Sequence, residues 1–106
     1  MLEKTRMMGN LLDDKLAEDI EVFELDGKHP EFDEVIVASV QVSRNLEGII
    51  NEIKKYEKEG KIEVKSYDIK NKEWILIDCY DLLIHVFVKE ARAFYDLDSL
   101  LRNYGK

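Results

Sequence analysis

The residues best suited to chemistry lie close together, and they are Asp78, Cys79, Asp81 and His85. Paired carboxylates can bind a metal or exchange protons, and a cysteine near a histidine can form a thiol nucleophile. An Asp-x-x-Asp pair alone is a weak motif, however, and the sequence holds no glycine-rich phosphate loop or serine elbow. His29 lies beside a proline in a predicted loop, without further ligands at metal-binding spacing. We therefore expect no catalytic site, no metal site and no cofactor.

Two apolar segments flank these residues and are predicted to form a β-hairpin. Residues 74–78 are the first strand and residues 82–88 the second. Cys79 and Tyr80 would be the two-residue loop between them, although Cys-Tyr is poor turn chemistry. Any chemistry in this stretch therefore depends on which face of the hairpin each side chain occupies.

The two faces of this hairpin differ in character, because successive side chains in a strand alternate sides. The predicted register places Trp74 opposite His85 and Asp78 opposite Asp81. It also places Cys79 and His85 on opposite faces, which argues against a thiol site. One face is aliphatic and is expected to pack on core helices. The other, the mixed face, comprises Trp74, Leu76, Asp78, Asp81, Leu83, His85 and Phe87.

Two interpretations of the mixed face stay open at this point. Aromatic anchors within a polar rim are typical of protein-binding surfaces. Trp74, His85 and Phe87 could equally be ordinary sheet residues under a helix, since large rings are usually well buried.

The charge of the chain bears on its partners: 23 acidic and 16 basic residues give a formal net charge of -7. Because Lys and Arg supply most of the affinity for phosphate backbones, an acidic domain is a poor candidate for binding nucleic acid directly. It suits a basic protein partner better, although the charge could also serve solubility alone.

The remaining elements follow from hydrophobic periodicity and from turn residues. A strand followed at once by a helix predicts a βα unit, and hence some parallel pairing. Together with the length of 106 residues, this predicts one α/β domain over 1–106, with a central mixed sheet of about five strands flanked by helices. Residues 1–16 have a helical pattern, and the helix is expected to start near Asn10. Strands are expected at 20–25, 32–40 and 61–67, with a helix between the last two that Ser43 caps and Gly60 ends. A short helix at 89–95, a final helix capped by Asp96 and a frayed tail from Arg102 complete the chain.

Three smaller expectations concern single side chains and the cell compartment. Arg44 lies in the first turn of a predicted helix, where the helix dipole disfavours a cation. It is either solvated or paired with a carboxylate of the turn that holds Asp78 and Asp81. Phe94 and Tyr95 are expected to fold back on the sheet. A single cysteine, with no secretory signal or bilayer-spanning apolar run, indicates a cytoplasmic protein that does not enter membranes.

The spacing of these residues resembles the ribosomal silencing factor family, also called Iojap-like. Its signature is a strand that begins with Trp, an Asp-x-Gly-Asp turn, an apolar strand with His then Phe, and a Glu-x-Arg-x-Phe-Tyr-x-Leu-Glu segment. An upstream Ala-Ser-Gly-x-Ser-x-Arg block accompanies it, and the resemblance runs from Leu11 to Leu101. The matching residues are Ala38, Ser39, Arg44, Trp74, Asp78, Asp81, His85, Phe87, Glu90, Arg92, Phe94, Tyr95, Leu97 and Asp98.

Four positions depart from the family pattern. Val40 and Tyr80 stand at usual glycine positions, Val42 replaces a serine and Leu101 a tryptophan. Loss of a glycine where φ is positive costs on the order of 1 kcal/mol or more. We therefore expect the local turns, and not the overall fold, to be affected.

The resemblance implies a reduced nucleotidyltransferase-like core and a function without catalysis. Family members bind a basic large-subunit ribosomal protein of the L-fourteen family, which blocks joining of the small subunit and represses translation. The residues expected to meet the partner are Trp74, Asp78, Asp81, Leu83, His85 and Phe87. The same face is suited to closing a homodimer in the absence of the ribosome.

A nucleotide-binding or nucleotidyl-transferring enzyme on the same core is the alternative. It would need an Asp-x-Asp metal pair after a Gly-Ser turn, and the sequence contains no Gly-Ser turn that such a pair could follow.

Overall fold

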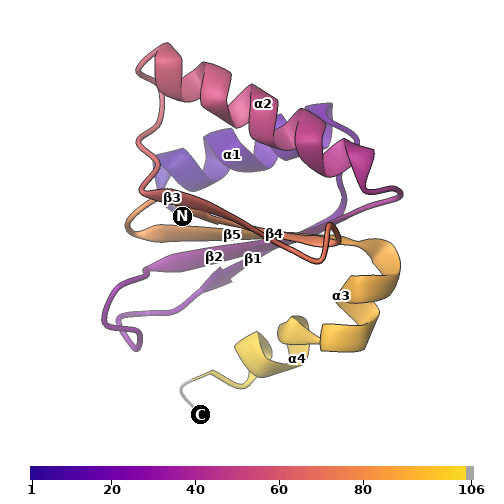
Figure 1. Cartoon of the computed structure of the whole chain (residues 1–106). Helices are drawn as coiled ribbons and strands as arrows, with labels where there is room; N and C mark the ends of the chain where they lie inside the picture. Colours follow the sequence, from indigo (N-terminus) through magenta and orange to yellow (C-terminus); the bar gives the residue numbers. More distant parts are fainter. Residues whose placement is uncertain (105–106) are drawn as a thin grey trace.

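The computed structural model describes residues 1–104, in which helices lie on both faces of a mixed five-stranded sheet (Figure 1). In chain order the elements are α1 (Glu3–Asp14), β1 (Glu18–Glu24), β2 (Glu34–Val40), α2 (Arg44–Lys58), β3 (Ser66–Lys70), β4 (Trp74–Asp78), β5 (Leu82–Val88), α3 (Lys89–Tyr95) and α4 (Leu97–Arg102). The predicted α/β class and the mixed sheet are confirmed.

The strand order of the sheet is β1-β2-β5-β4-β3, so that β1 and β3 form its two edges. β2 and β5 pair in parallel, whereas β1 with β2, β4 with β5, and β3 with β4 pair antiparallel. The βα unit expected from the sequence is therefore present as β2 and α2, and its parallel partner is the second strand of the hairpin.

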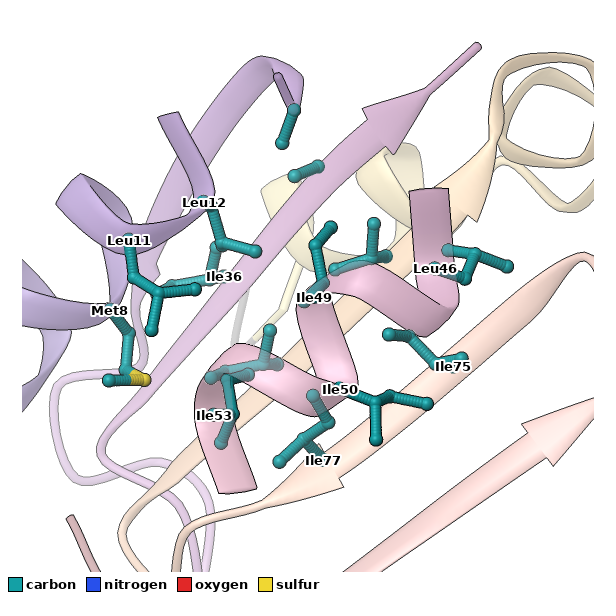
Figure 2. Packing of buried hydrophobic residues seen from close by; sticks show 14 of the residues in the cluster. Met8, Leu11, Leu12, Ile36, Leu46, Ile49, Ile50, Ile53, Ile75 and Ile77 are labelled. Atoms are coloured by element: carbon teal, nitrogen blue, oxygen red, sulfur yellow. The ribbon is translucent and has the colours of Figure 1, made fainter. Parts of the chain in front are cut away.

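The main core lies between the sheet and the pair α1 and α2 (Figure 2). Helix α2 buries Leu46, Ile49, Ile50 and Ile53, whose three- and four-residue spacing puts them on one side of the helix. Opposite them lies the aliphatic face predicted for the hairpin. The side chains of this face are all fully buried, with an exposed fraction of 0%. They are Ile75, Ile77, Leu82, Ile84 and Val86.

The ends of α2 confirm one sequence-based expectation and correct another. Gly60 has φ of +75° and ends the helix, with its N–H donating to Glu57 and the N–H of Lys61 donating to Tyr56. This pair of bonds is the Schellman arrangement that favours glycine. Ser43 occupies the N-cap position but has a helical backbone and makes no side-chain cap bond.

The predicted register of the hairpin is wrong by two residues. Trp74 lies opposite Phe87 and Asp78 opposite Leu83, so the turn residues are Tyr80 and Asp81. The N–H of Cys79 donates to the carbonyl of Leu82 at 2.8 Å, so the strand pairing includes Cys79, which was predicted to lie in the loop. Because the error is an even number of residues, no side chain changes face.

Two other elements also differ from the prediction. The predicted strand at 61–67 is wrong, because β3 begins at Ser66 and its turn to β4 contains Asn71 and Lys72, both with positive φ. Helix α1 begins at Glu3, before Gly9, since packing of the fully buried Met8 outweighs the cost of a helical glycine.

The two expected C-terminal helices are present, whereas the expected Asp96 cap and the frayed tail from Arg102 are wrong. Asp96 precedes α4 but has φ of 48° and makes no side-chain cap bond. Arg102 belongs to α4 and donates to Glu21 at 2.8 Å, and Tyr104 packs on the second core. The last part of the predicted tail, residues 105–106, lies outside the described residues.

The two positions that are usually glycine in the family differ in their backbone. Tyr80 has φ of +72°, a conformation that glycine adopts without steric cost, and its side chain is 53% exposed. Val40 is absent from the described positive-φ residues and is 1% exposed in β2. The strain expected from a lost glycine therefore falls on Tyr80 alone.

We predict opposite effects for glycine at these two positions. Tyr80→Gly should raise the free energy of unfolding by about 0.5–1 kcal/mol, because it removes the strain and little packing. Val40→Gly should lower it by roughly 2 kcal/mol or more, because it leaves a cavity in a strand. Urea unfolding of both variants measures the difference, and a destabilised Tyr80→Gly variant would contradict this account.

Candidate partner-binding face

The mixed face of the sheet is covered over only part of its area. Helices α3 and α4 lie on the opposite side of the sheet from α1 and α2 (Figure 1), and α3 contacts β5 and β2. They cover a second, smaller core, which contains Leu25, Val35, Val37, Phe87 and Ala91. On β4, by contrast, Trp74, Leu76 and Asp78 are half-buried, while Ile75 and Ile77 between them are fully buried.

The aromatic residues of the mixed face form a cluster that reaches from the interior to the surface. Phe87 is fully buried, and its ring lies 4.8 Å from that of Trp74, centroid to centroid. The exposed Tyr95 of α3 lies 4.9 Å from Trp74 and 6.1 Å from Phe87. Of the predicted partner-binding residues, Phe87 therefore supports the face from below, whereas Trp74 and the half-buried Leu83 reach the surface.

His85 fixes the orientation of Trp74. Its side chain is 6% exposed, and its Nδ1 accepts the indole N–H of Trp74 at 3.0 Å. Burial lowers the pKa of His85 to about 4, because the charged imidazolium would lose its hydration. At neutral pH the imidazole is therefore uncharged, with its proton on Nε2 and Nδ1 free to accept.

Cys79 lies on the other side of the sheet, as the sequence predicted. It is fully buried in the main core, and burial raises the pKa of its thiol to about 12. The thiol is thus protonated at neutral pH and separated from His85 by the sheet, so the two do not form a nucleophilic pair.

Asp78 and Asp81 lie at the turn end of the hairpin, but they are not opposite each other as predicted, because Asp78 pairs with Leu83. The Oδ1 atom of Asp78 accepts the N–H of Tyr80 at 2.9 Å, which stabilises the turn. Asp81 forms an ion pair with Lys4 of α1, whose Nζ also donates to the carbonyl of Cys79 at 3.1 Å. Part of the acidic rim is therefore neutralised within the chain.

The proposed pairing of Arg44 with this turn is wrong. In the parallel pair of β2 and β5, Glu34 lies beside Leu82 at the turn end, and Val40 lies beside Val88 at the other end. Arg44 follows Val40, so it lies at the end of the sheet away from Asp81. Within residues 1–104 it makes no ion pair, and it is exposed.

Arg92 connects the C-terminal helices to the sheet, a role that was not predicted from the sequence. Its Nη2 lies 2.8 Å from Oδ2 of Asp98 and its Nε lies 3.1 Å from Oδ1, a two-point contact. Its Nη1 donates to Ser39 Oγ at 2.9 Å and to the carbonyl of Asp19 at 2.6 Å. The guanidinium lowers the pKa of the Asp98 carboxyl. Arg92 thus joins α3 and α4 to β1 and β2.

Within residues 1–104, no three His, Cys, Asp or Glu side chains are grouped so that they could hold a metal ion. None of the described helices combines the length and the apolar character needed to cross a bilayer.

Comparison with known proteins decides the family. A family model described as "Ribosomal silencing factor during starvation" matches residues 1–105. The chain belongs to this family. The ribosomal silencing factor of Halalkalibacterium halodurans is 31% identical over 99 residues, which cover 92% of this chain and 85% of that protein. That of Bacillus subtilis is 33% identical over 89 residues, covering 83% and 75%.

The fold also matches a solved structure. A crystal structure of a protein from Chromobacterium violaceum superposes with a TM-score of 0.85 at 24% sequence identity, covering 93% of this chain and 83% of that one. This likeness concerns the fold alone. The ribosomal silencing factor family predicted from the sequence is confirmed, and the names of the two relatives describe a regulatory role rather than a catalysed reaction.

The buried histidine predicts a pH dependence of stability. Its pKa is about 4 in the folded chain, below the ordinary value of 6.5, so the unfolded chain takes up a proton first as the pH falls. The contribution of the neutral His85 to the free energy of unfolding is complete above about pH 6.5. It is lost as the pH falls toward 4, which lowers the free energy of unfolding by up to roughly 3 kcal/mol. His85→Gln should lack this loss in urea unfolding at pH 7.5 and 5.0.

The matched control is His29→Gln, which removes the other histidine of the chain. It should keep the loss of stability seen in the unaltered protein. An unaltered pH dependence in His85→Gln would mean that carboxylates, and not the buried imidazole, determine the effect.

Proposed function

We propose that this chain binds the large ribosomal subunit through a basic protein of the L-fourteen family and thereby blocks joining of the small subunit. The observation that carries the proposal is a half-exposed tryptophan held rigidly on the uncovered part of the mixed face, in a member of the ribosomal silencing factor family. No reaction is required of the chain, because a bound body of this size occupies the surface that the other subunit needs.

The charge of the domain supports a basic partner. The formal net charge is -7, and the side chain of Asp81 remains 39% exposed although it pairs with Lys4. Complementary charge accelerates encounter and excludes acidic partners, while contributing less to the final affinity.

The rigidity of the face supports binding strong enough to compete. Trp74 is fixed by Phe87 below it, by Tyr95 beside it and by its bond to His85. A pre-ordered ring loses little conformational entropy on binding, so more of the contact energy appears as affinity. In this proposal Trp74 and Leu83 contact the partner, Asp78 and Asp81 meet its cations, and His85 and Phe87 hold the contact residues in place.

The blocking function predicts a direct effect on subunit joining. Purified small and large subunits should reassociate less as the protein is added, and saturating protein should leave them separate in a sucrose gradient. The effect should require the protein to be present on the large subunit before mixing. Complete reassociation at saturating protein would reject the mechanism.

The proposed role of Trp74 predicts a loss of affinity on truncation. Trp74→Ala should weaken binding to isolated large subunits by more than about 1 kcal/mol, since buried aromatic anchors dominate interfaces. Trp74→Phe keeps a ring on Phe87 and should lose less. Tyr56→Ala, on the other side of the sheet, serves as the control and should bind normally. Equal affinity of Trp74→Ala and the unaltered protein would make Trp74 a scaffold residue only.

A further inference from the structure

Phe94 is the most exposed large apolar residue described in the chain, with 81% of its side chain accessible. The sequence predicted that it folds back on the sheet, and this is wrong. Its neighbour Tyr95 does turn to the sheet and lies 4.9 Å from Trp74, centroid to centroid. Phe94 and Tyr95 meet edge to face at 5.2 Å. The cluster of rings that contains the buried Phe87 therefore continues through Tyr95 to the exposed Phe94 on α3.

Two exposed carboxylates lie near Phe94 in the sequence. Glu90 precedes it by four residues in α3, so both side chains project from the same side of the helix. Asp96 follows directly after the helix. Both acids are exposed, and among residues 1–104 neither takes part in an ion pair, in contrast to Asp81 and Asp98. The cation nearest in sequence is Lys89, which is also exposed.

We propose that α3 extends the docking face, and that Phe94 receives an arginine of the basic partner. This inference rests on the proposed function and adds a site to it. A planar guanidinium stacks on an aromatic face and can pair with a carboxylate at the same time, which a flexible ammonium does less well. Glu90, on the same side of α3 as the ring, would neutralise the arginine as it loses water.

The position of α3 makes this surface continuous with Trp74. Tyr95 lies between the two rings, and Arg92 holds α3 against β2 through Ser39. A partner seated on Trp74 and Leu83 therefore reaches Phe94 without any movement of the chain. Because Phe94 is highly exposed, its ring contributes little to the stability of the fold. Substitutions of Phe94 should therefore change binding without unfolding the protein.

The first test measures affinity of the whole protein for isolated large subunits by cosedimentation titration. Phe94→Ala should raise the Kd about tenfold, and Phe94→Leu should raise it nearly as much, because leucine keeps the apolar surface and loses the aromatic face. The control is Leu16→Ala, which removes a side chain of comparable exposure, 73%, just after α1. Its Kd should equal that of the unaltered protein.

The second test addresses the carboxylate of Glu90. Glu90→Gln keeps the shape of the side chain and removes its charge. Its Kd should rise several-fold at low salt, and the difference from the unaltered protein should shrink as salt screens the charges.

The outcomes separate this inference from the proposed function. Normal affinity of Phe94→Ala, with weakened binding by Trp74→Ala, would overturn the site on α3 and leave the docking face intact. Normal affinity of both variants would overturn the docking face itself. Normal affinity of Phe94→Leu, or an equal loss in Leu16→Ala, would overturn stacking of an arginine on the ring.

Discussion

The structure depends on the burial of one aliphatic surface, the side of β4 and β5 that faces α1 and α2. Five side chains of this surface are completely removed from water, which stabilises the fold more than any single polar contact does. Since side chains alternate along a strand, this burial also forces Trp74, Leu76 and His85 to the other side. The half-exposed Trp74 ring on the mixed face is thus a direct consequence of how the core is built.

The C-terminal helices α3 and α4 cover only part of the mixed face, so the two faces of the sheet are covered unequally. Arg92 ties them to β1 and β2 through Asp98, Ser39 and the carbonyl of Asp19. Their coverage therefore falls on one half of the mixed face and leaves β4 half-exposed. A single half-buried cation, satisfied from three separate segments, determines which aromatic residues become scaffold and which reach the surface.

The faces of the hairpin could be predicted from the sequence even though its register could not. A register error of two residues preserves every inward and outward assignment, because the strand period is also two. The turn itself was mispredicted because Tyr80 adopts a positive φ that its residue type does not favour. The strand at Ser66–Lys70 was missed because it is a charged edge strand in which only Tyr67 and Ile69 alternate with polar residues, and four of its five residues are exposed.

The contacts of Arg92 and the exposure of Phe94 lay beyond sequence reasoning for a different reason. Ser39 and Asp19 are 53 and 73 residues from Arg92, so no local spacing indicates their meeting. Phe94 and Tyr95 are adjacent in a short helix, and only the tertiary structure decides which of the two rings turns inward. The family resemblance identified the residues of this segment correctly but not which of them face water.

The most direct test of the central claim is hydroxyl-radical footprinting of the protein alone and bound to isolated large subunits. This account predicts that oxidation of Trp74 and Tyr95 slows several-fold in the complex, while Tyr56 and Tyr67 on the helix-covered side react at unchanged rates. Protection of Tyr56 and Tyr67, with Trp74 as reactive as in the free protein, would show that the chain binds through its other side and would contradict the account.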